Sequence, residues 1–296
     1  MSYNSICCFR NSVSAGYRVL LEITNKCNQR CYYCNSRGTH ETSLQDITAI
    51  LKNISNIKIV DMIITGGEPL IHKDIWLILD LIKRTGYTAD ICSNGSVIDA
   101  TCAQRLSEYI DEISISLDVS THCAYKKLRG TDHFERVING IRLLRMNKIE
   151  VHLNAVMNKD TFSDIENLVG LACSLGVPSI SLINMLVSHA RKTLSVKSLS
   201  RHDVKQLTET VSSLRIKHPE LKINMKRFGS DTTEACLAGK RILGITSEGM
   251  VVPCLQLRNA KYVRCLDGRT KEINQSELDY AFNEFIWDCN AVDCNH

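Results

Sequence analysis

The sequence predicts an α/β protein whose main part is a partial (β/α)6 barrel, and three observations lead to this fold class. Between Tyr17 and Leu186, short β-rich runs alternate with amphipathic helical segments. Such alternation demands parallel strands joined by right-handed crossovers. Six strand–helix units are too few for a closed eight-stranded barrel, and a chain of 296 residues leaves room for one small further module.

The order of the elements follows from the hydrophobic pattern and from the residues that punctuate it. Strands are expected at 17–23, 58–65, 87–92, 112–117, 149–156 and 179–186. Helices are expected between them at 43–54, 74–85, 99–109, 134–147 and 161–175. Ser43 is a suitable N-cap for the first helix, and Gly176 with Pro178 ends the fifth. A further helix is expected at 200–217, with Ser200 as its N-cap.

Composition and charge argue against two classes of partner. The chain carries 36 basic and 32 acidic residues, a net charge of +4, and contains no basic run of five, so a nucleic-acid partner is not expected. No apolar run approaches the roughly 18 residues that cross a bilayer, so no membrane association is expected. The opening segment MSYNSICCFR does not have the form of a secretory signal. A cytoplasmic location is therefore predicted.

Fourteen cysteines are the most unusual feature of the composition. The cytosol keeps thiols reduced, so clustered cysteines there indicate metal ligands or redox chemistry rather than disulfides. Three of them cluster early in the chain, and five lie in the last 61 residues: Cys27, Cys31 and Cys34, then Cys236, Cys254, Cys265, Cys289 and Cys294. The other six are scattered and are expected to be small buried side chains.

Cys27, Cys31 and Cys34 form a C-x3-C-x2-C pattern. Three thiolates this close on one loop can hold an iron–sulfur cube and leave one iron without a protein ligand. An open coordination position distinguishes a reactive metal centre from a closed structural one. The alternative is a zinc site, which would need a fourth ligand such as His40.

Four motifs follow four consecutive predicted strands. The cysteine cluster follows the first strand, Gly66-Gly67-Glu68-Pro69 the second and Ser93-Asn94-Gly95 the third, and Ser116-Leu117-Asp118 ends the fourth. In parallel α/β folds the ligand site lies at the carboxyl ends of the strands. The four motifs are therefore expected to meet at one rim of the barrel.

These motifs resemble those of the radical S-adenosylmethionine (SAM) superfamily, including the aromatic residue Tyr33 before the third cysteine. The resemblance implies a partial radical SAM barrel with a [4Fe–4S] cluster whose open iron binds SAM. It further implies reductive cleavage of SAM to a 5′-deoxyadenosyl radical, which abstracts hydrogen from a substrate C–H bond. Such an enzyme needs an electron donor, for example a flavodoxin or ferredoxin, and is oxygen-sensitive.

The resemblance also implies roles for residues beyond the cysteines. Gly66, Gly67, Glu68 and Pro69 match the motif that binds the methionine amino group of SAM. Ser93-Asn94 resembles a family segment with Thr in place of Ser, and Ser116 to Asp118 one that continues with Gly, where this chain has Val119. The resemblance implies SAM contacts for these residues and for the aromatic residue of the cysteine motif: Ser93, Asn94, Ser116, Asp118 and Tyr33. Asn154 is expected to contact the SAM ribose. Arg191 is either a partner of the SAM carboxylate or a solvated surface residue.

The tail resembles the auxiliary-cluster modules called SPASM and twitch. We divide the chain into a barrel domain, 1–230, and a twitch/SPASM-like domain, 231–296, with a hairpin of strands 241–246 and 250–254 and a helix at 276–286. The resemblance implies one auxiliary [4Fe–4S] cluster held by four thiolates, with a structural zinc site as the alternative: Cys236, Cys254, Cys289 and Cys294. The C-x4-C spacing of the last two departs from the family pattern. Cys265 is either a core thiol or a hydrogen-atom donor.

The substrate is less constrained than the chemistry. Enzymes with such tails mostly modify ribosomally made peptides or protein side chains by cross-linking, epimerisation or oxidation, and this class is favoured here. The first alternative is a dehydrogenase or epimerase of an aminocyclitol or aminoglycoside-type molecule, because only 26 residues precede Cys27, too few for a peptide-recognition domain. The second alternative is a non-catalytic iron–sulfur or zinc-binding protein.

Overall fold

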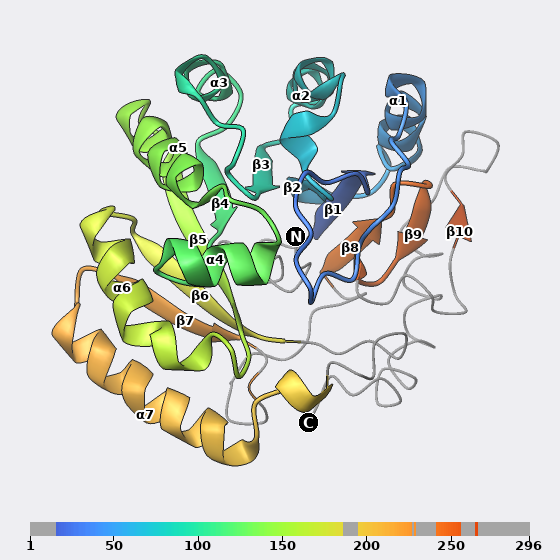
Figure 1. Ribbon diagram of the computed structural model, residues 1–296. Coiled ribbons are helices and arrows are strands. Elements are labelled where there is room, and N and C mark those ends of the chain that lie inside the picture. Colours follow the sequence, from blue (N-terminus) through green and yellow to red (C-terminus); the bar gives the residue numbers. More distant parts are fainter. Residues whose placement is uncertain (1–15, 186–194, 227, 229–240, 256–263, 266–296) are drawn as a thin grey trace.

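The fold is organised around one ten-stranded sheet with helices along its outer face (Figure 1). The computed structural model describes residues 16–185, 195–226, 228, 241–255 and 264–265. Within them the strand order is β10-β9-β8-β1-β2-β3-β4-β5-β6-β7, and all pairs from β8 to β7 are parallel. The strands are β1 Tyr17–Thr24, β2 Ile59–Gly66, β3 Ala89–Ser93, β4 Glu112–Ser116, β5 Glu150–Met157, β6 Ser179–Asn184, β7 Lys222–Lys226, β8 Ile242–Ile245, β9 Met250–Val252 and β10 Arg264–Cys265.

The helices confirm the predicted alternation and add two elements to it, η2 and α4. They are α1 Leu44–Asn53, η2 Pro69–Ile71, α2 Ile75–Arg84, α3 Ala100–Leu106, α4 His122–Arg129, α5 Phe134–Met146, η3 Phe162–Asp164, α6 Ile165–Ser174 and α7 Arg201–Lys217. The six strands and six helices predicted up to residue 217 lie within a few residues of their expected positions. The helix expected at 276–286 lies outside the described residues. Ser43 and Ser200 cap α1 and α7 as expected, the latter through a capping box with Asp203.

Four described elements were not predicted: the short η2 and β10, and the longer α4 and β7. The α4 segment HCAYKKLR is short and polar, and its buried face consists of Tyr125, Leu128 and Arg129. The β7 segment KINMK has a lysine at each end and only five residues. Neither carries enough apolar periodicity to stand out from loop sequence. Both are held by tertiary pairing, β7 by a parallel ladder to β6 and α4 by the packing of its buried face.

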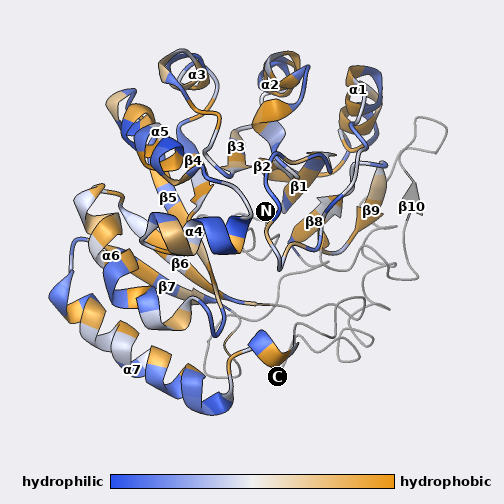
Figure 2. Cartoon of the chain, in the orientation of Figure 1, coloured by the Kyte–Doolittle hydropathy of each residue, from blue (hydrophilic) through white to orange (hydrophobic). Residues whose placement is uncertain are grey.

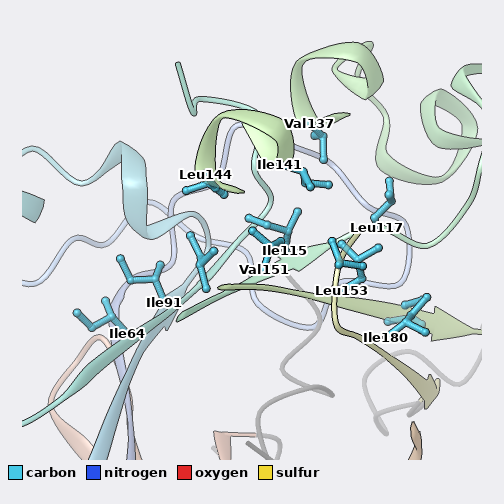
Figure 3. Close-up of a cluster of buried hydrophobic side chains, with 14 of the residues drawn as sticks. Ile64, Ile91, Ile115, Leu117, Val137, Ile141, Leu144, Val151, Leu153 and Ile180 are labelled. Carbon is cyan, nitrogen blue, oxygen red and sulfur yellow. The ribbon is translucent and has the colours of Figure 1, made fainter. Parts of the chain in front are cut away.

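The main core lies between the sheet and the helices. Branched strand residues such as Ile64, Ile91 and Ile115 belong to this core, and Ile115 lies beneath Val137 and Ile141 of α5 (Figure 3). The apolar stripes of the helices turn toward the sheet and their polar residues away from it (Figure 2). Because side chains alternate along a strand, the intervening residues face the inside of the barrel.

The predicted hairpin, now β8 and β9, extends the same sheet. β8 pairs in parallel with β1, with Leu20 opposite Gly244, and β9 returns antiparallel to β8. A second apolar cluster joins the inner face to the hairpin through Leu20, Ile63, Cys92, Ile242, Val252 and Leu255. The division of the chain near residue 230 remains a prediction. No helix in the described part of the chain is long and apolar enough to cross a membrane.

Candidate active site

The cysteine loop leaves the carboxyl end of β1 and is anchored along its length. The Gly38 N–H donates to the carbonyl of Asn25 at 3.1 Å and closes the base of the loop. The N–H groups of Arg30 and Tyr32 donate to the last carbonyls of α4, at 2.9 and 3.3 Å. The loop conformation thus depends on α4, the helix that the sequence pattern did not reveal.

The three loop thiols suit a multinuclear cluster better than a single ion. Cys31 and Cys34 are buried and Cys27 is half-buried, and their sulfurs do not all lie within 4.8 Å of one another, whether or not His40 is included. Three thiolates on one tetrahedral zinc would lie about 3.8 Å apart. A cube whose irons are bound by separate thiolates has no such requirement. The donor set, three thiols on one loop, therefore fits a [4Fe–4S] cluster with one open iron.

Hydrogen-bond donors approach the loop sulfurs from the protein. The Gln29 N–H lies 3.4 Å from Cys27 Sγ, and Asn94 Nδ2 lies 3.9 Å from the same sulfur. Arg129 Nη1 lies 3.8 Å from Cys31 Sγ. Burial raises the pKa of the Cys27 thiol, so the free thiol is protonated at neutral pH. Donors and a positive charge beside sulfur favour the thiolate once iron replaces the proton.

A buried ion pair lies against the cysteine loop. Arg129 Nη2 lies 2.6 Å from Asp118 Oδ2, and both side chains are 1% exposed. The Tyr33 hydroxyl donates to the same carboxylate oxygen, and the Val156 N–H donates to the other at 2.9 Å. Burial lowers the pKa of Arg129 and Asp118 raises it, with a net rise. Tyr33 and Asp118, expected to contact SAM, thus bond to protein groups that hold the loop.

The two glycines of the GGEP turn are required by the chain that leads into the cysteine loop. The Gly67 N–H donates to the Thr24 carbonyl at 2.7 Å, and the Glu68 N–H to the Lys26 carbonyl at 2.8 Å. A Cβ on Gly67 would lie 1.9 Å from the Lys26 oxygen. Gly66 combines a φ of +144° with a contact of 2.1 Å from its hypothetical Cβ to the Thr24 oxygen. Only glycine lets the turn lie against the end of β1.

Glu68 organises the neighbouring loop. Its carboxylate is fully buried and accepts from the Leu70 N–H at 3.0 Å, the Ser93 hydroxyl at 2.9 Å and the Asn94 N–H at 2.7 Å. Burial raises the pKa of Glu68, while these donors lower it. Pro69 begins the 3-10 turn η2 directly after it. The sequence predicted Glu68 as a ligand-binding acid, and the structure shows it joining the second and third motifs.

An amide network links the third motif to the cysteine loop. Asn94 Nδ2 donates to Asn28 Oδ1 at 2.8 Å, and Asn28 Nδ2 donates to the Ser96 hydroxyl at 2.9 Å. Asn94 Oδ1 in turn accepts from the Ser96 N–H and hydroxyl at 2.9 and 2.6 Å. Asn28 and Ser96 were not predicted; their one sequence signal is adjacency to Cys27 and to Ser93-Asn94-Gly95.

The inner face of the barrel beside these motifs is polar. Ser116 of β4 lies in register with Asn154 of β5, which lies beside Ser181 of β6. Thr65 Oγ1, Ser114 Oγ and Asn154 Oδ1 are buried and have no hydrogen-bond partner among the described residues. Native proteins rarely leave such atoms unpaired. The unpaired atoms fit a cradle for a polar ligand next to the cysteine loop.

Several predicted ligands lie outside the described residues. These are Arg191, Cys236, Cys289 and Cys294. Cys254 is described and buried, 5% exposed, just after β9. Position 265 lies in β10, opposite Met250 of β9. The four-thiolate set of the tail and the donor role of Cys265 remain predictions.

Comparison with protein families and curated proteins identifies relatives of this chain. The family model described as "Radical SAM superfamily" matches residues 21–172. A "Probable GTP 3',8-cyclase" of Saccharolobus islandicus is 27% identical over 214 residues, which are 70% of this chain and 68% of the relative. Its counterpart in Saccharolobus solfataricus is 27% identical over 203 residues, 67% and 65% of the two chains.

Solved structures share the fold over most of the chain. Streptococcus suis SuiB bound to S-adenosylmethionine matches with a TM-score of 0.73 and 18% identity, over 93% of this chain and 67% of that one. AnSMEcpe with bound AdoMet matches with a TM-score of 0.74 and 17% identity, over 91% and 82%. BtrN in complex with AdoMet and 2-DOIA matches with a TM-score of 0.51 and 16% identity, over 93% and 87%. At these identities the likeness shows the fold alone.

Proposed function

The chain belongs to the radical SAM superfamily, and from this premise we propose that Cys27, Cys31 and Cys34 hold a [4Fe–4S] cluster at the rim of the barrel. When bound, the cluster and SAM supply a 5′-deoxyadenosyl radical that removes hydrogen from a substrate C–H bond. The observation that carries the assignment is the set of three thiols on one loop anchored by a buried Arg129–Asp118 pair.

The protein's own residues do the positioning. The amide of Asn94 and the guanidinium of Arg129 fix two of the three ligand sulfurs by donating toward them. The glycine turn and Glu68 keep the second and third motifs against the loop. Ser116 and Asn154, with the unpaired oxygen of the latter, offer polar contacts to bound SAM beside the cluster. The backbone of Gly66 to Pro69, and Arg191, complete the proposed SAM contacts.

We propose that the substrate is a ribosomally made peptide or a protein side chain. Two fold neighbours are peptide complexes: SuiB bound to the precursor peptide SuiA, and anSMEcpe with AdoMet and the Cp18Cys peptide. In this proposal residues 231–296 carry one auxiliary [4Fe–4S] cluster on Cys236, Cys254, Cys289 and Cys294. Cys265 is the proposed hydrogen-atom donor. A flavodoxin or ferredoxin supplies the electron.

The relatives named as probable GTP 3',8-cyclases suggest a second candidate substrate, GTP. A triphosphate is strongly anionic and needs cations that are not already neutralised. In the described part of the chain, the buried cations Arg18 and Arg129 are each paired with a carboxylate, and Lys226 has a partner. These three buried cations therefore offer no free charge to a triphosphate. An aminocyclitol, the class left open by the sequence, is compatible with these paired cations.

Deuterium transfer distinguishes these substrates. The reconstituted protein is incubated without oxygen with SAM, dithionite and one deuterated candidate: a peptide encoded beside the gene, GTP or an aminocyclitol. Mass spectrometry then measures deuterium in the released 5′-deoxyadenosine. Label from the peptide alone is expected. Label from GTP or from the aminocyclitol, with none from the peptide, would overturn the peptide assignment while leaving the superfamily chemistry intact.

A further inference from the structure

A cysteine, a histidine and a glutamate converge on the outer surface of the barrel, on the helical side of the sheet and away from the cysteine loop. Cys173 lies in the last turn of α6, His218 is the C-cap of α7, and Glu220 lies in the loop before β7. Their ligand atoms all lie within 4.8 Å of one another. In the part of the chain that the structure describes, no other three such side chains have their ligand atoms this close together.

The distances within this cluster match those between ligands of one tetrahedral ion. Cys173 Sγ lies 3.4 Å from His218 Nδ1, which lies 3.4 Å from a Glu220 carboxylate oxygen. With usual zinc bond lengths, sulfur and nitrogen ligands are about 3.6 Å apart, and nitrogen and oxygen ligands about 3.3 Å. Both separations need only a small side-chain adjustment.

The backbone holds the three positions in place before any ion binds. The His218 N–H donates to the Leu214 carbonyl at 2.9 Å and ends α7 there. The Leu221 N–H donates back to the His218 carbonyl at 3.1 Å, and the Lys222 N–H donates to the Pro178 carbonyl at 3.0 Å. The loop between α7 and β7 is therefore a tight, bonded turn, and its backbone loses little conformational entropy when an ion binds.

The ligand types and the exposure indicate which ion fits. We propose that Cys173, His218 and Glu220 form a second metal site, for Zn²⁺ or a cation of similar softness, separate from the cysteine loop. A thiolate, an imidazole and a carboxylate suit borderline cations rather than Ca²⁺ or Mg²⁺. The thiolate and carboxylate charges balance a divalent ion.

The site is open to solvent on one side. The His218 side chain is 20% exposed and that of Glu220 is 62% exposed, so water can supply the fourth ligand. Without metal, burial and the nearby Glu220 carboxylate raise the pKa of Cys173, and a cation would reverse the second influence. The bound ion would fasten the end of α6 to the turn between α7 and β7.

Zinc retention tests the proposal on the full chain. The protein is reconstituted with iron and sulfide, passed over a chelating resin, titrated with Zn²⁺ against a zinc indicator, and then gel-filtered before elemental analysis. We expect about one retained zinc per chain for the wild type and for Cys123→Ser, the control, whose thiol is exposed on α4. We expect none for Cys173→Ser and at least a tenfold higher Kd for Glu220→Gln.

Glu220→Gln keeps the test decisive if Cys173→Ser folds poorly, because the Glu220 side chain is exposed and removing its charge leaves packing intact. Failure of the wild type to retain zinc would overturn the proposal. So would wild-type affinity in Glu220→Gln, or full zinc content in folded Cys173→Ser. These readouts do not involve SAM cleavage and are independent of the proposed function.

Discussion

Asp118 and Glu68 show that a motif residue can act through its neighbours. Both were predicted from their motifs as ligand contacts, and both form buried bonds to protein groups. Sequence spacing identified which residues gather at the rim, and the contacts of Asp118 and Glu68 with SAM remain predictions. The protein partner of Asp118 is Arg129, a residue that no motif marks and whose helix the hydrophobic pattern missed.

Removing Arg129 from the buried Arg129–Asp118 pair leaves the Asp118 carboxylate without its opposite charge. We predict that Arg129→Met lowers the free energy of unfolding by about 3–5 kcal/mol, measured by denaturant titration. Arg84→Met is the control, because Arg84 pairs with Asp80 in the open, where its side chain is 76% exposed. The control should change stability by less than about 1 kcal/mol. Equal effects of the two substitutions would refute a supporting role for the pair.

A cluster held by three thiolates is poorly held by two. Cys31→Ala should reduce the iron content at the loop and abolish 5′-deoxyadenosine formation, since Cys31 is one of three proposed ligands. Cys123→Ala, on the exposed face of α4, should retain both. Iron analysis and chromatography of the reaction mixture measure the two quantities. Undiminished SAM cleavage in Cys31→Ala would remove this residue from the ligand set.

At the scale of elements, the sequence predicted the strands and helices that have local apolar periodicity and missed those that lack it. Six strands and six helices were predictable because apolar periodicity and capping residues such as Ser200 mark them locally. The strand β7 and the helix α4 gain their stability from partners distant in sequence, so their own residues carry little signal. The convergence of four motifs at one rim was predictable because all four follow parallel strands.

The close approach between the GGEP turn and the end of β1 can be tested with two alanine substitutions. Gly67→Ala should destabilise the protein by about 3 kcal/mol or more, because its Cβ would meet a backbone oxygen that cannot move aside. Gly170→Ala, in α6 with nothing within 4 Å of its new Cβ, should stabilise it by about 0.5–1 kcal/mol. Thermal unfolding of both variants gives the comparison. A harmless Gly67→Ala would contradict the contact.

For the whole molecule, the sheet joins parts of the chain that are far apart in sequence. The hairpin was predicted from its turn residues, but its parallel pairing with β1 was not, because nothing local specifies a strand's distant partner. The hairpin covers Leu20 and Ile63 on the inner face. The barrel and the proposed auxiliary-cluster domain are therefore expected to fold together. The division near residue 230 separates them only by the cofactor that each is proposed to hold.

A chain truncated after residue 230 tests this coupling. Losing β8 and β9 leaves one edge of β1 unpaired and uncovers the apolar cluster around Cys92. We predict aggregation, or a Tm well below that of the full chain, even without any cluster bound. A truncated chain that is monomeric and as heat-stable as the full chain would show that the barrel does not need the hairpin.

The most direct test of the central assignment is a spectroscopic titration of the oxygen-free, iron-reconstituted protein with SAM. A [4Fe–4S] cluster with one open iron, held by Cys27, Cys31 and Cys34, should give a reduced electron paramagnetic resonance signal that changes shape as SAM binds, with 5′-deoxyadenosine released under dithionite. A protein that carries zinc alone, or a reduced cluster whose signal SAM leaves unaltered and that releases no 5′-deoxyadenosine, would contradict the assignment.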